Sequence, residues 1–225
     1  MSKKIYINPG HSNVDPGAVG FETERKLNVK AGSFMNAHLL ANYECVTKVT
    51  DGKVNSTAVV AGEANDWGAD LFVSIHFNAG GGDGYEALVY NENRVALGKV
   101  FDKHVKAAGQ NSRGVKLRPD LAVLRLTNMP AVLNEGAFVD NKKDITDWNE
   151  DAELEKLGIA YAEAAAEWLK LEKKVPTPAP AKGIYRVFNE AGAQVGAFAV
   201  ETNAFNEVKK QLQAGGSARI TLREK

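Results

Sequence analysis

The chain has 225 residues, of which 28 are basic and 28 acidic, so its formal net charge at pH 7 is zero. This length permits a sizeable core together with a small additional domain. A nucleic-acid surface would normally show a basic excess, so recognition has to come from a shaped site rather than from bulk charge. The single cysteine, Cys45, excludes an internal disulfide.

The first residues of the chain, Met1 to Asn8, include two lysines but no apolar stretch of signal length. No other segment is long and apolar enough to cross a bilayer. We therefore expect no signal peptide, no membrane insertion and a protein that is kept in the cytoplasm after synthesis.

Apolar spacing and turn residues predict an α/β arrangement up to residue 171. The predicted helices cover residues 24–42, 56–67, 95–108 and 152–171. The predicted strands cover residues 5–7, 43–49, 71–75, 86–90, 122–124 and 131–134. Residues 80–84 are rich in glycine but lack the lysine and the spacing of a phosphate-binding loop, so we interpret them as a flexible rim of a groove.

Ionisable residues stand where three predicted strands end. His76 follows the buried strand at residues 71–75, His11 follows the first strand, and Glu135 follows the strand at residues 131–134. In open α/β sheets the ligand crevice lies beyond the carboxyl ends of the strands. Side chains at these positions are therefore able to leave the core and meet a metal or a substrate.

Glu24 would complete a set of two histidines and one glutamate with His11 and His76. This is the three-ligand composition of a catalytic zinc site, with the fourth position open for water. Glu22 is the alternative third ligand. Either glutamate could instead only complement the dipole at the start of the predicted helix. The histidines outside this set, His38 and His104, are interpreted as a packing residue and a solvated residue.

Several segments carry a family resemblance. They are Pro9-Gly10-His11, Asp15-Pro16-Gly17-Ala18, Glu24 with Leu27 and Val29, Ala64-Asn65, residues 69–78 and residues 132–141. In this order, over residues 3–171, the chain resembles the zinc-dependent N-acetylmuramoyl-L-alanine amidases of the Amidase_3 family. The resemblance implies a mixed, mostly parallel sheet flanked by helices. It also implies one Zn²⁺ per chain, held by the residues His11, Glu24 and His76.

The resemblance makes Glu135 essential to catalysis. A carboxylate there would take a proton from the attacking water and deliver it to the leaving amine. The alternative is a strand-end carboxylate that pairs with Lys142 or Lys143. The chain also departs from the family pattern: Ser12-Asn13 replaces two glycines, and an arginine that is common before Ala64-Asn65 is missing. These departures bear on loop shape and substrate fit more than on metal binding.

Alternating prolines predict a semi-rigid extended linker over residues 173–182. It would separate a catalytic domain, residues 1–172, from a small ββαβ domain, residues 183–225. That domain has predicted strands at residues 184–188, 194–200 and 218–222 and a predicted helix at residues 204–213. It resembles the small wall-binding domains of lysins from phages of Bacillus and its relatives. Because it is close to the lower size limit for independent folding, we expect self-association or docking on the first domain.

The function implied by the resemblance is hydrolysis of the amide between N-acetylmuramic acid and L-alanine in peptidoglycan. A phage or prophage endolysin, held in the host cytoplasm until a holin opens the membrane, fits this domain organisation. The alternatives are a zinc peptidase acting within the stem peptide and a wall-binding protein that has lost catalysis. A serine hydrolase is disfavoured because the sequence contains no G-x-S-x-G.

Overall fold

The computed structural model describes residues 2–53, 56–174, 183–189, 191, 194–198, 207, 210 and 218–224. The chain divides into two compact units, Met1–Lys174 and Val175–Lys225. This division falls within the expected linker, of which residues 175–182 lie outside the described part. Among the described helices, none combines the length and the apolar character needed to span a bilayer.

The first unit is built on a six-stranded sheet with the order β2-β1-β3-β6-β4-β5. Its strands are β1 (Lys3–Pro9), β2 (Cys45–Val49), β3 (Leu71–Asn78), β4 (Tyr85–Val89), β5 (Ser112–Leu117) and β6 (Ala131–Phe138). Strands β2, β1, β3 and β6 are parallel to one another. Strand β4 pairs antiparallel with β6 and parallel with β5. The expected mixed, mostly parallel sheet is confirmed, and β1, β3 and β6 end at one common edge.

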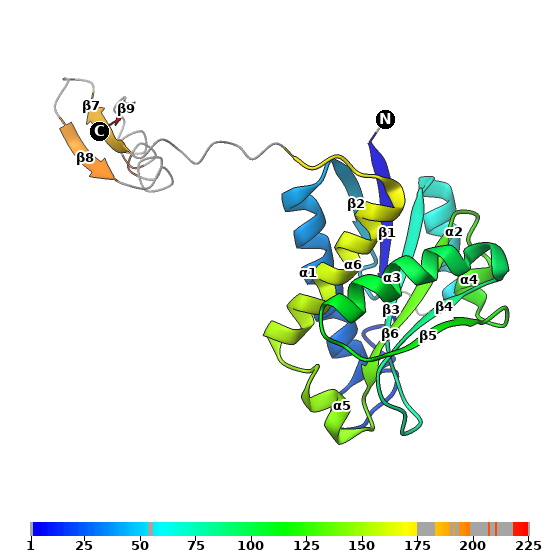
Figure 1. The fold of residues 1–225 in the computed structure, drawn as a ribbon. Helices are drawn as coiled ribbons and strands as arrows, with labels where there is room; N and C mark the ends of the chain where they lie inside the picture. Colours follow the sequence, from blue (N-terminus) through cyan, green and yellow to red (C-terminus); the bar gives the residue numbers. More distant parts are fainter. Residues whose placement is uncertain are drawn as a thin grey trace. The chain divides into compact units, whose positions relative to one another are not determined.

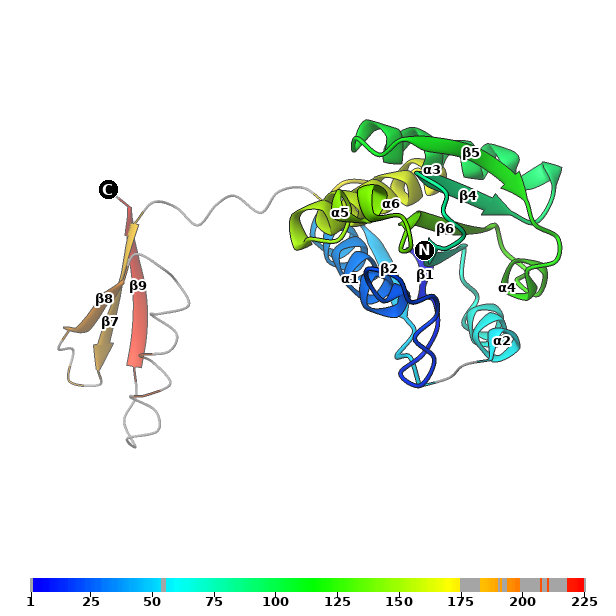
Figure 2. The same cartoon turned by 90° about the horizontal axis from the view of Figure 1, so that it is seen from below.

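Helices cover both faces of this sheet (Figures 1 and 2). They are α1 (Glu24–Asn42), α2 (Thr57–Trp67), α3 (Val95–Ala107), α4 (Ala122–Arg125), α5 (Lys142–Thr146) and α6 (Asp151–Leu169), with a short 3₁₀ turn η1 (Glu92–Arg94). Helices α1, α3 and α6 bury the larger apolar cluster on one face. Helices α2 and α4 bury a smaller cluster on the other face.

Side-chain alternation along β3 decides which face carries the ionisable residues. Val73 and Ile75 belong to the cluster under α1, α3 and α6, whereas Phe72 belongs to the cluster under α2 and α4. Successive side chains of a strand point to opposite faces. His76, four residues after Phe72, therefore lies on the α2 and α4 face. The strand continues to Asn78, so His76 belongs to the strand rather than following it.

One expectation about local structure was wrong. Residues 122–124 form part of helix α4 rather than a strand, because the backbone N–H groups of Arg125 and Leu126 bond back to Leu121 and Ala122. A run of three apolar residues is too short to separate the two alternatives by periodicity. In the glycine-rich loop, Asp140 accepts hydrogen bonds from the N–H groups of Gly80 and Gly81.

The second unit contains a three-stranded antiparallel sheet with the order β8-β7-β9. Its strands are β7 (Gly183–Asn189), β8 (Gln194–Phe198) and β9 (Ala218–Glu224). They match the three strands expected for the ββαβ domain. The expected helix at residues 204–213 lies almost wholly outside the described residues. Only Glu207 and Lys210 of that stretch are described, and both are helical.

Candidate active site

The loop after β1 presents His11 in an uncommon backbone conformation. The φ angle of His11 is 65°, in the left-handed region that non-glycine residues rarely adopt. Its Nδ1 lies 2.9 Å from Oδ2 of Asp15. The buried hydroxyl of Ser12 accepts bonds from the N–H groups of Val14 and Asp15. Ser12 therefore stabilises the turn that brings Asp15 to His11.

Glu24, the first residue of α1, lies between the two histidines. Its Oε2 is 3.0 Å from Nε2 of His11, and its Oε1 is 2.8 Å from Nδ1 of His76. The N–H groups of Ala18 and Phe77 also donate to this carboxylate, at 2.9 and 3.3 Å. Glu24 is buried, whereas each histidine remains partly accessible. The three side chains that the sequence singled out are therefore brought together by β1, α1 and β3.

Two glycines allow this close packing. A Cβ atom on Gly10 would lie 2.1 to 2.6 Å from the imidazole ring of His76. A Cβ atom on Gly17 would lie 2.5 Å from both Glu24 and His11, and Gly17 also has a φ of +69°. Real Cβ atoms do not approach other atoms so closely. Any side chain at position 10 would displace His76. This explains why a glycine stands between Pro9 and His11.

The charges within this group favour proton retention on His11. Its pKa is raised to about 9, chiefly by its interaction with Glu24 and further by Asp15, although burial opposes the shift. Burial disfavours ionisation of Glu24, but the interactions with His11 and His76 outweigh it and hold the pKa of Glu24 well below its usual range. Without a metal, a buried carboxylate and a protonated imidazole stabilise one another.

The three side chains also fit a metal ion. One ligand atom from each of His11, Glu24 and His76 can be chosen so that all lie within 4.8 Å of one another. Ligands at zinc distances of about 2.0–2.2 Å in a tetrahedral site lie roughly 3.4 Å apart, so small side-chain shifts are sufficient. Two imidazoles and one carboxylate are also a known donor set of catalytic zinc. We conclude that the residues present suit Zn²⁺.

The alternative ligand and the other histidines lie elsewhere. Glu22, which precedes α1, pairs with Lys26 at 2.8 Å. His38 contacts Glu163 at 2.7 Å. His104, which was expected to be solvated, lies 2.8 Å from Glu167 and is only 22 % exposed at its side chain. Glu24 rather than Glu22 therefore belongs to the cluster.

Glu135 stands beside the cluster on the neighbouring strand. It is the register partner of His76 across β3 and β6. Its Oε2 is buried and has no hydrogen-bond partner within the described residues, and it pairs there with neither Lys142 nor Lys143. Burial raises the pKa of Glu135 to about 7, with the charges of Glu24 and Glu86 adding to the rise and that of His76 opposing it. Glu135 can therefore exchange a proton near neutrality.

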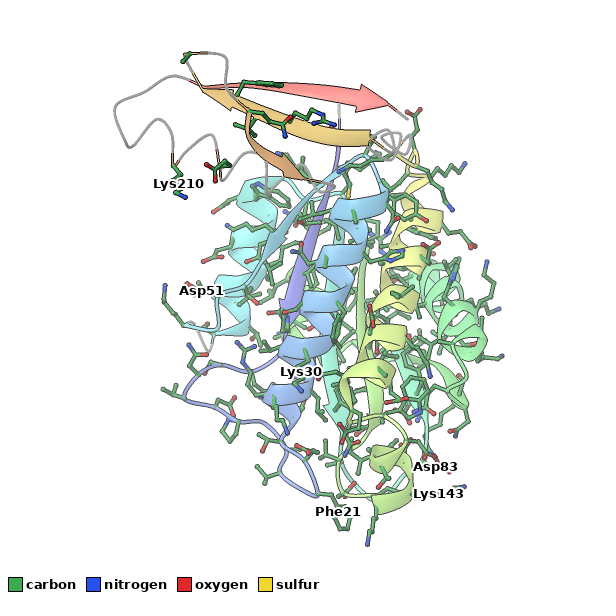
Figure 3. The ribbon with its side chains drawn as sticks, turned by 90° about the vertical axis from the view of Figure 1, so that its left-hand side faces the viewer. Phe21, Lys30, Asp51, Asp83, Lys143 and Lys210 are labelled. Atoms are coloured by element: carbon green, nitrogen blue, oxygen red, sulfur yellow. The ribbon has the colours of Figure 1, made fainter. Side chains whose placement is uncertain are left out.

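A groove of about 300 Å³ opens next to the histidines on the α2 and α4 face. Its lining combines His11 and His76 with polar side chains from β1, from the residue after β2 and from the residue before α2, notably Asn8, Thr50 and Ser56. Figure 3 shows Phe21, Asp83 and Lys143 gathered at one end of this unit. These residues mark the loop after β1, the loop after β3 and the start of α5, which border the same edge of the sheet.

Sequence reasoning missed the residues that hold the ligands in place. Arg25 donates to the carbonyl oxygens of Pro9 and Gly10 at 2.7 and 3.1 Å, and Asn28 also donates to Gly10. Asp15 fixes the ring of His11, as carboxylates do for zinc-bound histidines. The four-residue spacing of His11 and Asp15 was a visible signal. The contacts of Arg25 depend on the fold and left no signal.

The fold and this cluster define an α/β protein with a candidate metal site at the edge of its sheet. The Amidase_3 family, described as N-acetylmuramoyl-L-alanine amidase, matches residues 5–167. The chain belongs to this family. Because the match spans most of the first unit, the amidase activity on peptidoglycan applies to that unit.

Individual relatives agree with this assignment. The chain is 30 % identical over 227 residues to a sporulation-specific N-acetylmuramoyl-L-alanine amidase of Bacillus subtilis, covering 97 % of this chain and 84 % of the relative. It is 36 % identical over 195 residues to the endolysin of Bacillus phage SPP1, covering 81 % and 72 %. The solved catalytic domain of CwlV, an N-acetylmuramoyl-L-alanine amidase from Bacillus (Paenibacillus) polymyxa, has a TM-score of 0.71 and 26 % identity, covering 76 % of this chain and 99 % of that domain.

Proposed function

We propose that this protein is a zinc-dependent amidase that cleaves the bond between N-acetylmuramic acid and L-alanine in peptidoglycan. In this proposal His11, Glu24 and His76 hold one Zn²⁺, and Glu135 is the catalytic acid and base. The observation that carries it is that His76 and Glu135 are register partners on the adjacent strands β3 and β6. This pairing puts a carboxylate, whose Oε2 is buried and has no hydrogen-bond partner within the described residues, directly beside a zinc-compatible cluster.

Each residue has a role that follows from its surroundings. A bound zinc ion would lower the pKa of a water molecule and polarise the scissile carbonyl. Asp15 and Gly10 keep the two imidazole rings in position, and the interactions with His11 and His76 hold the pKa of Glu24 well below its usual range. Glu135 accepts the proton of the attacking water at Oε2 and then donates it to the amine of L-alanine. A pKa near 7 suits both directions of this transfer.

Two substitutions separate metal binding from proton transfer. His76→Ala removes one of three protein ligands, so the purified protein should contain little zinc and should be inactive. Glu135→Gln keeps the shape of the side chain but removes the base. It should retain zinc and lose about 10²- to 10⁴-fold in activity. The measurements are zinc stoichiometry and the rate of wall lysis for both variants.

A Glu135→Gln protein that lyses walls at the wild-type rate, or that loses its zinc, would contradict the assigned role. The bond itself is tested by mass spectrometry of digested peptidoglycan. Peptides with a free N-terminal alanine and intact glycan strands are expected. New reducing sugar ends, or cleavage only within the stem peptide, would favour another hydrolase, including the zinc peptidase.

We further propose that the protein acts as a phage or prophage endolysin that waits in the host cytoplasm. The similarity to the endolysin of phage SPP1 supports this role, whereas the similarity to the sporulation amidase favours a role in sporulation. Expression in the host with and without a holin distinguishes them. Lysis only when the holin is present is expected of an endolysin. Production confined to sporulating cells would contradict it.

A further inference from the structure

His76 and Glu135 are side by side on adjacent strands, and we call this line of residues across the sheet the catalytic row. A pair of basic side chains lies beyond Glu135 in the same row. In the antiparallel pairing of β4 with β6, Glu86 is the register partner of Glu135. Glu86 therefore lies on the same face of the sheet as Glu135 and His76. Its Oε1 is 2.5 Å from both Nε of Arg113 and Nζ of Lys116, which come from β5. The row thus runs across four strands, from β3 through β6 and β4 to β5.

The group formed by Glu86, Arg113 and Lys116 has one more positive charge than negative charge. Glu86 is buried, with a side chain that is 7 % exposed, and the interactions with Lys116 and Arg113 keep its pKa below the usual range although burial opposes ionisation. The side chains of Arg113 and Lys116 are each 41 % exposed. One buried carboxylate with two accessible cations leaves a net charge of about +1 that faces solvent.

Arg113 also has hydrogen-bond donors that its contact with Glu86 does not use. Within residues 2–53 and 56–174 its guanidinium uses Nε for Glu86 and forms no other hydrogen bond. Its plane lies over the ring of Phe138, with 5.3 Å from Cζ to the ring centroid. The two terminal amino groups of a guanidinium held in this way can bind a carboxylate in a bidentate manner.

We propose that Arg113 and Lys116, held by Glu86, form a binding site for a carboxylate of the peptide that follows the scissile bond. This inference rests on the proposed function. The glycan is neutral once the muramic acid carboxyl is part of the amide, whereas a stem peptide with a free carboxylate next to L-alanine is anionic. The groove beside the histidines offers hydroxyl and amide groups, which suit a neutral sugar.

The dimensions agree with this placement. Adjacent strands are about 4.8 Å apart, so β5 lies roughly 10 Å from β6, which carries Glu135. Long side chains from Arg113 and Lys116 reach back over β4 to Glu86. An extended peptide advances about 3.5 Å per residue. A carboxylate on the first or second residue after L-alanine therefore falls within reach of the pair.

The test uses two substrates that differ only in charge. They are N-acetylmuramoyl-L-alanyl-D-glutamic acid and its uncharged diamide. The wild-type protein should have a lower KM for the acid than for the diamide. Arg113→Ala and Lys116→Ala should each raise KM for the acid about 5- to 20-fold and leave the diamide unchanged, because only the acid has a charged hydrogen-bond partner to lose. Each single variant keeps one cation against Glu86, which protects the fold.

The matched control is Lys30→Ala. Lys30 is 38 % exposed and pairs with Asp151 at 2.5 Å, but it belongs to α1, which covers the opposite face of the sheet (Figure 3). It should leave both KM values unchanged. Equal effects of Arg113→Ala on the acid and the diamide would overturn the inference. So would a change seen only on intact walls, which would indicate another anionic wall component.

Calorimetric titration with the cleaved peptides keeps this inference separate from the proposed function. L-alanyl-D-glutamic acid should bind to the wild-type protein more tightly than its diamide, and Arg113→Ala should abolish the difference. Such binding without hydrolysis of either substrate would contradict the amidase mechanism and support the carboxylate site. Hydrolysis of both substrates without any preference for the acid would support the amidase mechanism and contradict the carboxylate site.

Discussion

At the scale of single residues, the raised pKa of His11 couples metal binding to pH. A ligand imidazole must be neutral, but metal-free His11 holds its proton up to about pH 9 because of Glu24 and Asp15. Zinc binding near pH 7 should therefore release about one proton. The apparent zinc affinity should rise by about tenfold per pH unit up to about pH 9 and level off above it.

Titration calorimetry in buffers of different ionisation enthalpy measures this proton release. Asp15→Asn provides the comparison, because the pKa of His11 loses one of the charges that raise it. In the Asp15→Asn protein, the number of protons released on zinc binding should fall to zero at a lower pH than in the wild-type protein. Zinc binding that is independent of pH between 6 and 9 would contradict this coupling between the proton on His11 and the metal.

At the scale of secondary-structure elements, α1 and α6 touch through a glycine. A Cβ atom on Gly158 would lie 2.6 Å from Cβ of Phe34 and 2.7 Å from the backbone oxygen of Ala31. Gly158→Ala should force these helices apart and destabilise the fold by about 1–3 kcal/mol. The melting temperature should fall by roughly 2–4 °C per kcal/mol. Thermal unfolding followed by circular dichroism measures it.

Gly62→Ala is the matched control, since Gly62 lies in α2 and, apart from its chain neighbours and the backbone of its own helix, no described atom comes within 4 Å of the place that its Cβ would take. There the gain in helix propensity should stabilise the protein by about 0.5–1 kcal/mol. If both substitutions raise the melting temperature, the contact between α1 and α6 is looser than the distances indicate.

The elements themselves were largely predictable because their signals are local. The helix at residues 24–42 was predicted with its observed limits, since Leu27, Ala31 and Met35 repeat at helical spacing and are all fully buried. Helix α4 was missed because residues 122–124 carry too little periodicity. The antiparallel direction of β4 depends on pairing with β6, a strand more than forty residues later, and no local pattern encodes it.

The same distinction applies to the candidate site. His11, His76 and Glu135 could be singled out because each follows a predicted apolar strand, although β3 and β6 extend past His76 and Glu135 in the structure. Their proximity follows from the register of β1, β3 and β6, which the sequence shows only indirectly. The role of Glu86 was not visible at all. It reads as one more polar residue in a strand until the pairing with Glu135 is known.

At the scale of the whole molecule, the division after Lys174 predicts that the first unit folds without the second. A protein truncated at Lys174 should keep its zinc and its melting transition, because its core is complete within that unit. We propose that the second unit binds the cell wall, so truncation should weaken binding to intact walls. Sedimentation with purified walls measures this. Equal binding by both forms would show that the second unit is not the targeting device.

The two ends of the first unit lie together, away from the active site. Ser2 and Lys3 border the same hollow as Glu44 and residues 169–172, and the N–H of Glu44 donates to the carbonyl of Glu172. His11 lies beyond the other end of β1, about 20 Å away at the rise of a seven-residue strand. A module fused at either end therefore starts far from the catalytic groove. Such an arrangement lets evolution or engineering exchange wall-targeting modules, or rejoin the ends in a circular permutant, without rebuilding the enzyme.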